Sequence, residues 1–126
     1  MNVLLLIFLL ITGNEDKTVK TSVYNATKSQ CDADPTLTAS GIRINLDALN
    51  KGKIRYISLS RDLLKRYKFG TYISIKSCNP YYAGCWRVVD TMSKRFKNKI
   101  DFLQPLKSKQ KPPKIVKIWI RNYSKI

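Results

Sequence analysis

The apolar residues of this chain lie in short segments that alternate with polar residues and are separated by frequent turns. The clearest segments, rich in β-branched and aromatic residues, are 55–59, 71–75, 85–89 and 114–120. A two-residue repeat places successive side chains on opposite faces of a strand. With 126 residues in the chain, about five or six such strands predict one small all-β domain that closes, or nearly closes, into a barrel.

Other elements follow from the residues between these strands. Residues 23–27 predict the opening strand. Ser60 is a helix-capping residue type, so residues 60–67 predict one or two helical turns, which Gly70 ends. Asp47 is expected to cap a short segment at 48–50. We expect the single domain to cover residues 20–126.

The amino terminus predicts export. Residues 3–11 are uninterruptedly apolar and are followed by small or polar residues, a pattern typical of a signal peptide and too short to span a bilayer. We therefore expect a signal peptide at 1–13, no membrane span in the mature chain, and a periplasmic, outer-membrane-associated or extracellular location. Because no Lys or Arg precedes the run, an uncleaved anchor or a buried strand remains an alternative.

The charge predicts an anionic partner. Lys and Arg total 24 against 8 for Asp and Glu, giving a net charge of +16. A hydrophobic content of 44% is too high for a disordered polycation, so the chain should be a folded body that attracts anions. The anion could be nucleic acid, acidic lipid or a cell-wall polymer. Export argues against nucleic acid, and so does the lack of a nucleic-acid-binding motif.

The cysteines leave two alternatives open. Cys78 and Cys85 flank the turn-rich segment 79–84 between two predicted strands, where they could form a disulfide or stay as thiols. Cys31 would then be left over. Three dispersed cysteines without any histidine make a poor zinc site and leave no histidine to activate a catalytic thiol. We expect no metal and no cofactor.

Several short motifs occur in an order that resembles a known family. They are 24–27, 38–41, 57–62, 69–71, 89–92 and 100–101. This order resembles the 3D (three-aspartate) domain, the double-psi β-barrel at the end of membrane-bound lytic transglycosylase A, which is related to rare lipoprotein A and the expansins. The resemblance spans roughly residues 24–120. It implies an all-β fold, a small six-stranded double-psi β-barrel with one or two short helices.

The resemblance also implies roles for three aspartates. Asp101 matches the catalytic acid/base of the transglycosylase, and Asp90 matches the aspartate beside it. Asp62 is the nearest candidate for the third aspartate, although the aspartate-proline usual in the family is absent there. Where the family has glycines after the Asp-Thr pair, this chain has residues 92–95, Met-Ser-Lys-Arg. That departure predicts a differently shaped groove.

One carboxyl can serve this chemistry. Cleaving a glycosidic bond requires a protonated acid beside the departing oxygen, and a second carboxylate in a partly desolvated groove keeps that proton in place. Asp90 could do this for Asp101. In a lytic transglycosylase the 6-hydroxyl of the sugar closes onto its own anomeric carbon, so no second carboxylate is required. A two-carboxylate hydrolase remains an alternative.

Substrate contacts are expected from the loop that joins the two aspartates and from aromatic residues at the barrel mouth: Thr91, Lys94, Arg95, Asn98, Tyr82 and Trp86. The alternative for the basic residues is a solvated loop. The partner would be peptidoglycan or another anionic wall polysaccharide, bound by a monomer.

Two other functional classes stay open. The first is an expansin-like module that binds or loosens the wall without cleaving it. The lack of the extra domain that completes the groove of the transglycosylase favours this class. The second is a basic nucleic-acid-binding protein.

Overall fold

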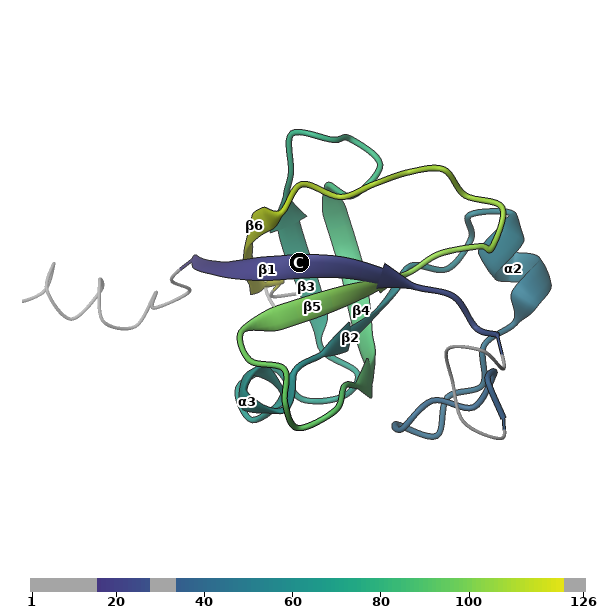
Figure 1. The fold of residues 1–126 in the computed structure, drawn as a ribbon, viewed down its shortest axis with the longest axis horizontal. Helices are drawn as coiled ribbons and strands as arrows, with labels where there is room; N and C mark the ends of the chain where they lie inside the picture. The colour runs from purple at the N-terminus through teal and green to yellow at the C-terminus, as the bar shows by residue number, and fades with distance from the viewer. Residues whose placement is uncertain (1–15, 28–33, 122–126) are drawn as a thin grey trace, which may run out of the picture.

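The computed structural model describes residues 16–27 and 34–121. These residues form a closed six-stranded β-barrel with two short helices (Figure 1). The elements are β1 (Lys17–Tyr24), α2 (Leu46–Asn50), β2 (Tyr56–Leu59), α3 (Arg61–Leu64), β3 (Tyr72–Lys76), β4 (Gly84–Thr91), β5 (Lys99–Leu103) and β6 (Ile115–Ile120). The small closed barrel predicted from the sequence is confirmed.

The barrel is mixed in strand direction. Its strands follow the order β1-β5-β2-β4-β3-β6, and β6 pairs with β1 to close it. β1 and β5 are parallel, as are β2 and β4, while the remaining pairs are antiparallel. Parallel neighbours need crossover connections. β5 lies between β1 and β2 although it is distant from both in the sequence (Figure 1).

Alternation along the strands separates the interior of the barrel from its outer face. Ile100 and Phe102 of β5 are fully buried, as are Ile57 and Leu59 of β2. These four residues belong to the main apolar core. Since successive side chains point to opposite faces of a strand, the polar residues between them lie on the outer face of the barrel.

A second, smaller apolar cluster covers part of that outer face. Leu49 of α2 packs with Ile44 and with Leu103 at the end of β5. The cap of α2 is Asn45, whose side-chain oxygen accepts a hydrogen bond of 3.0 Å from the Ala48 N–H. The prediction that Asp47 is the cap is therefore wrong: Asp47 lies in the first turn, where it pairs with Lys51 at 3.0 Å.

The other differences from the sequence prediction concern element ends. β1 spans Lys17–Tyr24 rather than 23–27, because it pairs along its length with both β5 and β6. β5 was not predicted as a strand. Helix α3 ends at Leu64, and Gly70 instead forms the turn before β3, at a φ of 89° that favours glycine.

The predicted signal peptide at 1–13 and Cys31 lie outside the described residues. Within the part of the chain that the structure describes, no helix has both the length and the apolar character needed to cross a membrane.

Candidate functional site

A cleft of about 680 Å³ lies on the outer face of the barrel, over β5, β2 and the end of β4. Its lining combines carboxylates, hydroxyls and one arginine with a few apolar side chains: Tyr24, Asp34, Pro35, Leu37, Thr38, Ala39, Ser58, Arg61, Asp90, Thr91, Met92, Ser93, Phe96 and Asp101. Both aspartates that the sequence singled out as a catalytic pair are in this set.

Strand register explains how the two aspartates meet. Asp101 of β5 has two Cα partners, Ser22 on β1 and Ser58 on β2. Ser58 in turn is the partner of Asp90 on β4, beyond a register shift in that pair. A row of polar residues therefore crosses four neighbouring strands. Since strands lie about 4.8 Å apart, the backbones of the two aspartates are roughly 10 Å apart, separated by Ser58.

Asp101 is partly buried between β1 and β2. The Ser22 hydroxyl donates a hydrogen bond to its Oδ1. Burial raises the pKa of the Asp101 carboxyl above its ordinary value of 3.8; the Lys99 ammonium opposes this rise, and the Asp90 carboxylate adds to it. The expectation of a raised pKa agrees with this result, but burial contributes more than Asp90 does.

Asp90 holds the wall of the cleft in place. Its Oδ1 accepts hydrogen bonds of 3.0 Å from the backbone N–H groups of Ala39 and Thr91. The adjacent N–H of Ser40 donates to the carbonyl of Val89 at 3.2 Å. Asp90 therefore fixes the loop at 38–40 against β4, in addition to acting electrostatically on Asp101.

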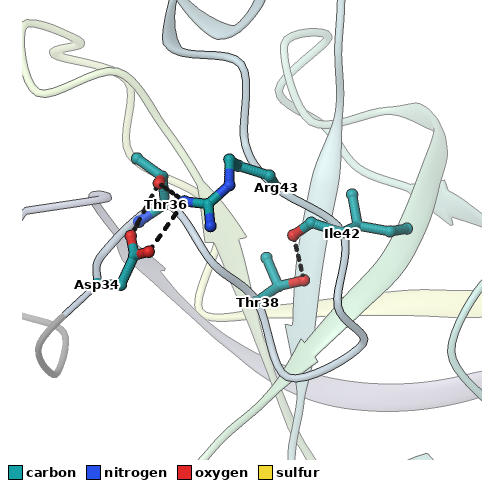
Figure 2. Close-up of polar contacts among 5 residues, drawn as sticks. All are labelled: Asp34, Thr36, Thr38, Ile42 and Arg43. Carbon is teal, nitrogen blue, oxygen red and sulfur yellow. Dashed lines mark hydrogen bonds and ion pairs between the residues drawn. The ribbon is translucent and has the colours of Figure 1, made fainter.

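The loop that forms this wall has its own polar framework (Figure 2). Asp34 accepts hydrogen bonds from the backbone and the hydroxyl of Thr36, at 3.1 and 2.9 Å, and pairs with Arg43 at 2.9 Å. Further along, the Thr38 hydroxyl donates to the Ile42 carbonyl at 2.6 Å. These contacts hold the loop as a compact turn beside the row of polar residues.

Sequence reasoning missed two residues that line the cleft, Ser58 and Arg61, and also Ser22, which lies outside the lining but binds Asp101. Ser22 and Ser58 are the register partners of Asp101, and Arg61 extends its guanidinium so that Nε donates to the Met92 carbonyl at 3.1 Å. Ser58 and Arg61 fall inside the motif at 57–62, so that motif was a usable signal. Ser22 had none, because its place depends on the pairing of β1 with β5.

Asp62 does not belong to the cleft. Its Oδ2 accepts a hydrogen bond of 2.9 Å from the Asn98 N–H. Burial acts to raise the pKa of Asp62, but hydrogen bonds from the Ser60 side chain and from the backbone of Asn98, Leu63 and Asp62 together lower it. The Asn98 side chain donates to the Thr18 carbonyl at 3.1 Å. Asp62 and Asn98 thus brace the turn into β5, where Asn98 has a φ of 50°.

The remaining predicted loop contacts fall in different places. Thr91 lines the cleft, with its hydroxyl donating to the Leu59 carbonyl at 2.9 Å. Arg95 lines a second, neighbouring hollow. Lys94 is exposed and lines neither of the two.

The two aromatic residues predicted to stack on sugars are in the core, so that prediction is wrong. Tyr82 is 0% exposed and Trp86 2%. The Tyr82 hydroxyl donates to the Gln104 side chain, and the Trp86 indole N–H donates to the Tyr82 carbonyl at 2.9 Å. Both rings pack on Phe102, with centroids 4.6 and 4.7 Å from it. Both belong to the main apolar core, Trp86 from β4 and Tyr82 from the turn before it.

The disulfide alternative for Cys78 and Cys85 is not formed. The strand partner of Cys85 is Ser74, and Cys78 lies beyond the end of β3. The turn therefore does not place the two cysteines opposite each other. Among the described residues, no three Cys, Asp or Glu side chains gather in a way that could hold a metal ion.

No protein-family model matches this chain, and no curated protein matches it significantly.

Proposed function

We propose that this protein cleaves glycosidic bonds of peptidoglycan in the manner of a lytic transglycosylase, with Asp101 as the acid/base. The proposal is supported mainly by the way in which separate motif segments meet at one cleft. Five of the six segments behind the resemblance to the 3D domain contribute a residue to one cleft, and those residues include Tyr24, Thr38, Ser58, Asp90 and Asp101. The mixed six-stranded barrel is also consistent with the double-psi barrel of that family.

The raised pKa of Asp101 suits a general acid. A carboxyl that stays protonated to a higher pH can donate its proton to the glycosidic oxygen as the bond from that oxygen to the anomeric carbon breaks. The resulting carboxylate then takes the proton of the sugar's 6-hydroxyl, whose oxygen bonds to the anomeric carbon. The products are a 1,6-anhydro end and a free hydroxyl, and Asp101 is protonated again.

The other cleft residues supply position and charge. Asp90 favours the protonated form of Asp101 and holds the loop wall through Ala39 and Thr91. Arg61 brings a cation to the lining, where it can bind carboxylates of the peptide stems. Under this proposal the protein is exported to the periplasm, outer membrane or extracellular space, where its substrate is found.

The test is to incubate purified protein with peptidoglycan and identify the soluble products by mass spectrometry. Wild-type protein should release fragments with 1,6-anhydro ends. Asp101→Asn should release them at least about 10²-fold more slowly, while keeping the circular dichroism spectrum and melting temperature of a folded protein. The matched control is Asp47→Asn, the same change at an exposed position on α2 outside the cleft, which should cleave like wild type.

Each other outcome is informative. Reducing ends instead of anhydro ends would indicate a hydrolase that uses water. Cleavage retained by a folded Asp101→Asn protein would rule out the assigned acid/base.

A second function, an expansin-like module that binds the wall without cleaving it, is favoured by one observation. Both carboxylates of the pair already accept hydrogen bonds from the protein itself, Asp101 from Ser22 and Asp90 from two N–H groups. Such carboxylates can serve to shape a binding surface. Co-sedimentation with peptidoglycan without any released fragment would support this function over catalysis.

A further inference from the structure

A second hollow of about 640 Å³ lies beside the cleft. We call it the basic groove, and it is lined by Lys20, Thr21, Arg95, Phe96, Lys97, Lys99, Lys114 and Ile115. Five of these residues are cationic and none is acidic. The ion pairs found in the described part of the chain, Arg43 with Asp34 and Lys51 with Asp47, involve none of them.

The fold itself brings these cations together. Lys20 of β1 is the register partner of Lys99 on β5 and of Ile115 on β6. The N–H of Thr21 donates to the Lys114 carbonyl at 3.1 Å, which places the start of β6 against β1. Lysines from three strand regions are therefore gathered on one surface. Their mutual repulsion is unfavourable unless an anion lies among them.

The groove and the cleft share one residue, Phe96, which lines both. A linear polymer lying in the cleft could therefore continue into the groove. Arg95 lies over the Phe96 ring with its guanidinium carbon 4.7 Å from the centroid, and the Lys99 ammonium lies 4.4 Å from it. The ring is thus engaged by cations that the groove presents.

We propose that the basic groove binds the repeated anionic groups of a polysaccharide that extends from the cleft. This inference rests on the proposed function, since it makes the groove an extension of the same glycan site. Ammonium groups suit such a ligand, because they attract phosphate or carboxylate without requiring one fixed orientation.

The aromatic content argues for a polysaccharide rather than a nucleic acid. Proteins that bind single strands present aromatic faces on which bases stack. Phe96 is the one aromatic side chain among the residues that line the groove, and two cations already contact it. Charge is present without a stacking surface.

The test measures binding of wild-type protein to three soluble dextrans of equal length, one carrying phosphate groups, one carboxymethyl groups and one unmodified. We expect salt-sensitive binding of both anionic dextrans and none of the neutral one. Lys20→Gln combined with Lys114→Gln should weaken the binding of anionic dextran on the order of tenfold. The matched control, Lys53→Gln with Lys109→Gln, removes the same charge at exposed lysines outside the groove and should bind like wild type.

Three results would overturn the inference. They are equal binding of neutral dextran, an equal loss in the control variant, and binding of a single-stranded oligonucleotide that is tighter than that of anionic dextran and is lost in the groove variant. Because dextran binding does not depend on bond cleavage, failure of the peptidoglycan assay alone leaves the groove assignment intact. Cleavage with normal dextran binding by the groove variant would reject the groove alone.

Discussion

The cleft and the basic groove are neighbours with opposite composition. In a chain with 8 acidic residues, the cleft contains Asp34, Asp90 and Asp101, whereas the groove has none. Each cleft aspartate has a defined partner within the protein. The groove cations make no ion pair among the described residues. This difference is what the two proposals require, with proton transfer in the cleft and attraction of an anion in the groove.

The largest expected effect is on kcat, and it should distinguish a cleft variant from a groove variant. Asp101→Asn removes the acid, so kcat for peptidoglycan should fall by roughly 10²- to 10⁴-fold while anionic dextran still binds. The double variant Lys20→Gln with Lys114→Gln should act mainly by raising KM. Steady-state kinetics together with dextran titrations measure both. If each variant changed kcat and KM alike, the division between the regions would fail.

The core aromatic cluster belongs to neither region, and its loss should act on stability. Trp86→Ala removes a buried ring that packs on Phe102 and lies under Arg55, 4.2 Å from the guanidinium carbon. We expect about 3–5 kcal/mol of lost unfolding free energy, measured by urea denaturation. Unchanged stability combined with lost glycan binding would restore Trp86 as a sugar contact.

Asp90→Asn should change both the pKa of Asp101 and the loop at 38–40 that forms the wall of the cleft. Without the Asp90 charge, the pKa of Asp101 falls towards its ordinary value. In the proposed mechanism the protonated form of Asp101 is the active one, so activity should be present below this pKa and should be lost as pH rises through it. The fall in rate on the alkaline side of the pH–rate profile should therefore occur at a lower pH than in the wild type. The amide still accepts the hydrogen bonds from Ala39 and Thr91 but less strongly, costing about 1 kcal/mol of stability.

Lys99→Met should produce the smallest effect, in the opposite direction. The Lys99 ammonium lowers the pKa of Asp101, so its removal should raise that pKa and move the same fall in rate to a higher pH. Lys99 also lines the groove, so affinity for anionic dextran should fall modestly. A shift in the same direction for Asp90→Asn and Lys99→Met would contradict the assigned electrostatics.

Most of the architecture could be predicted from local patterns in the sequence. Alternation at 55–59, 71–75, 85–89 and 114–120 corresponds to β2, β3, β4 and β6, because a half-buried strand requires that period. The motif order also indicated Asp90 and Asp101, which line one cleft. β5 escaped prediction because the basic segment that leads into it was interpreted as a loop joining the two aspartates.

Predictions based on residue type were wrong where the role of a side chain depends on its tertiary surroundings. Tyr82 and Trp86 have the chemistry to stack on sugars, but tertiary packing puts both inside the barrel. Cys78 and Cys85 flank a turn, yet the register pairs Cys85 with Ser74. Asp62 has the charge of a site residue, but its position in α3 directs it to the Asn98 backbone.

A small β-barrel with a large excess of positive charge could be predicted from the chain alone, because strand period and composition are local properties. Which residues share a surface depends instead on strand pairing over long distances in the chain. β5 pairs in parallel with β1 and antiparallel with β2, and its pairing with β1 puts Ser22 beside Asp101 and Lys20 beside Lys99. Such neighbours are far apart in the chain, and no local pattern encodes them.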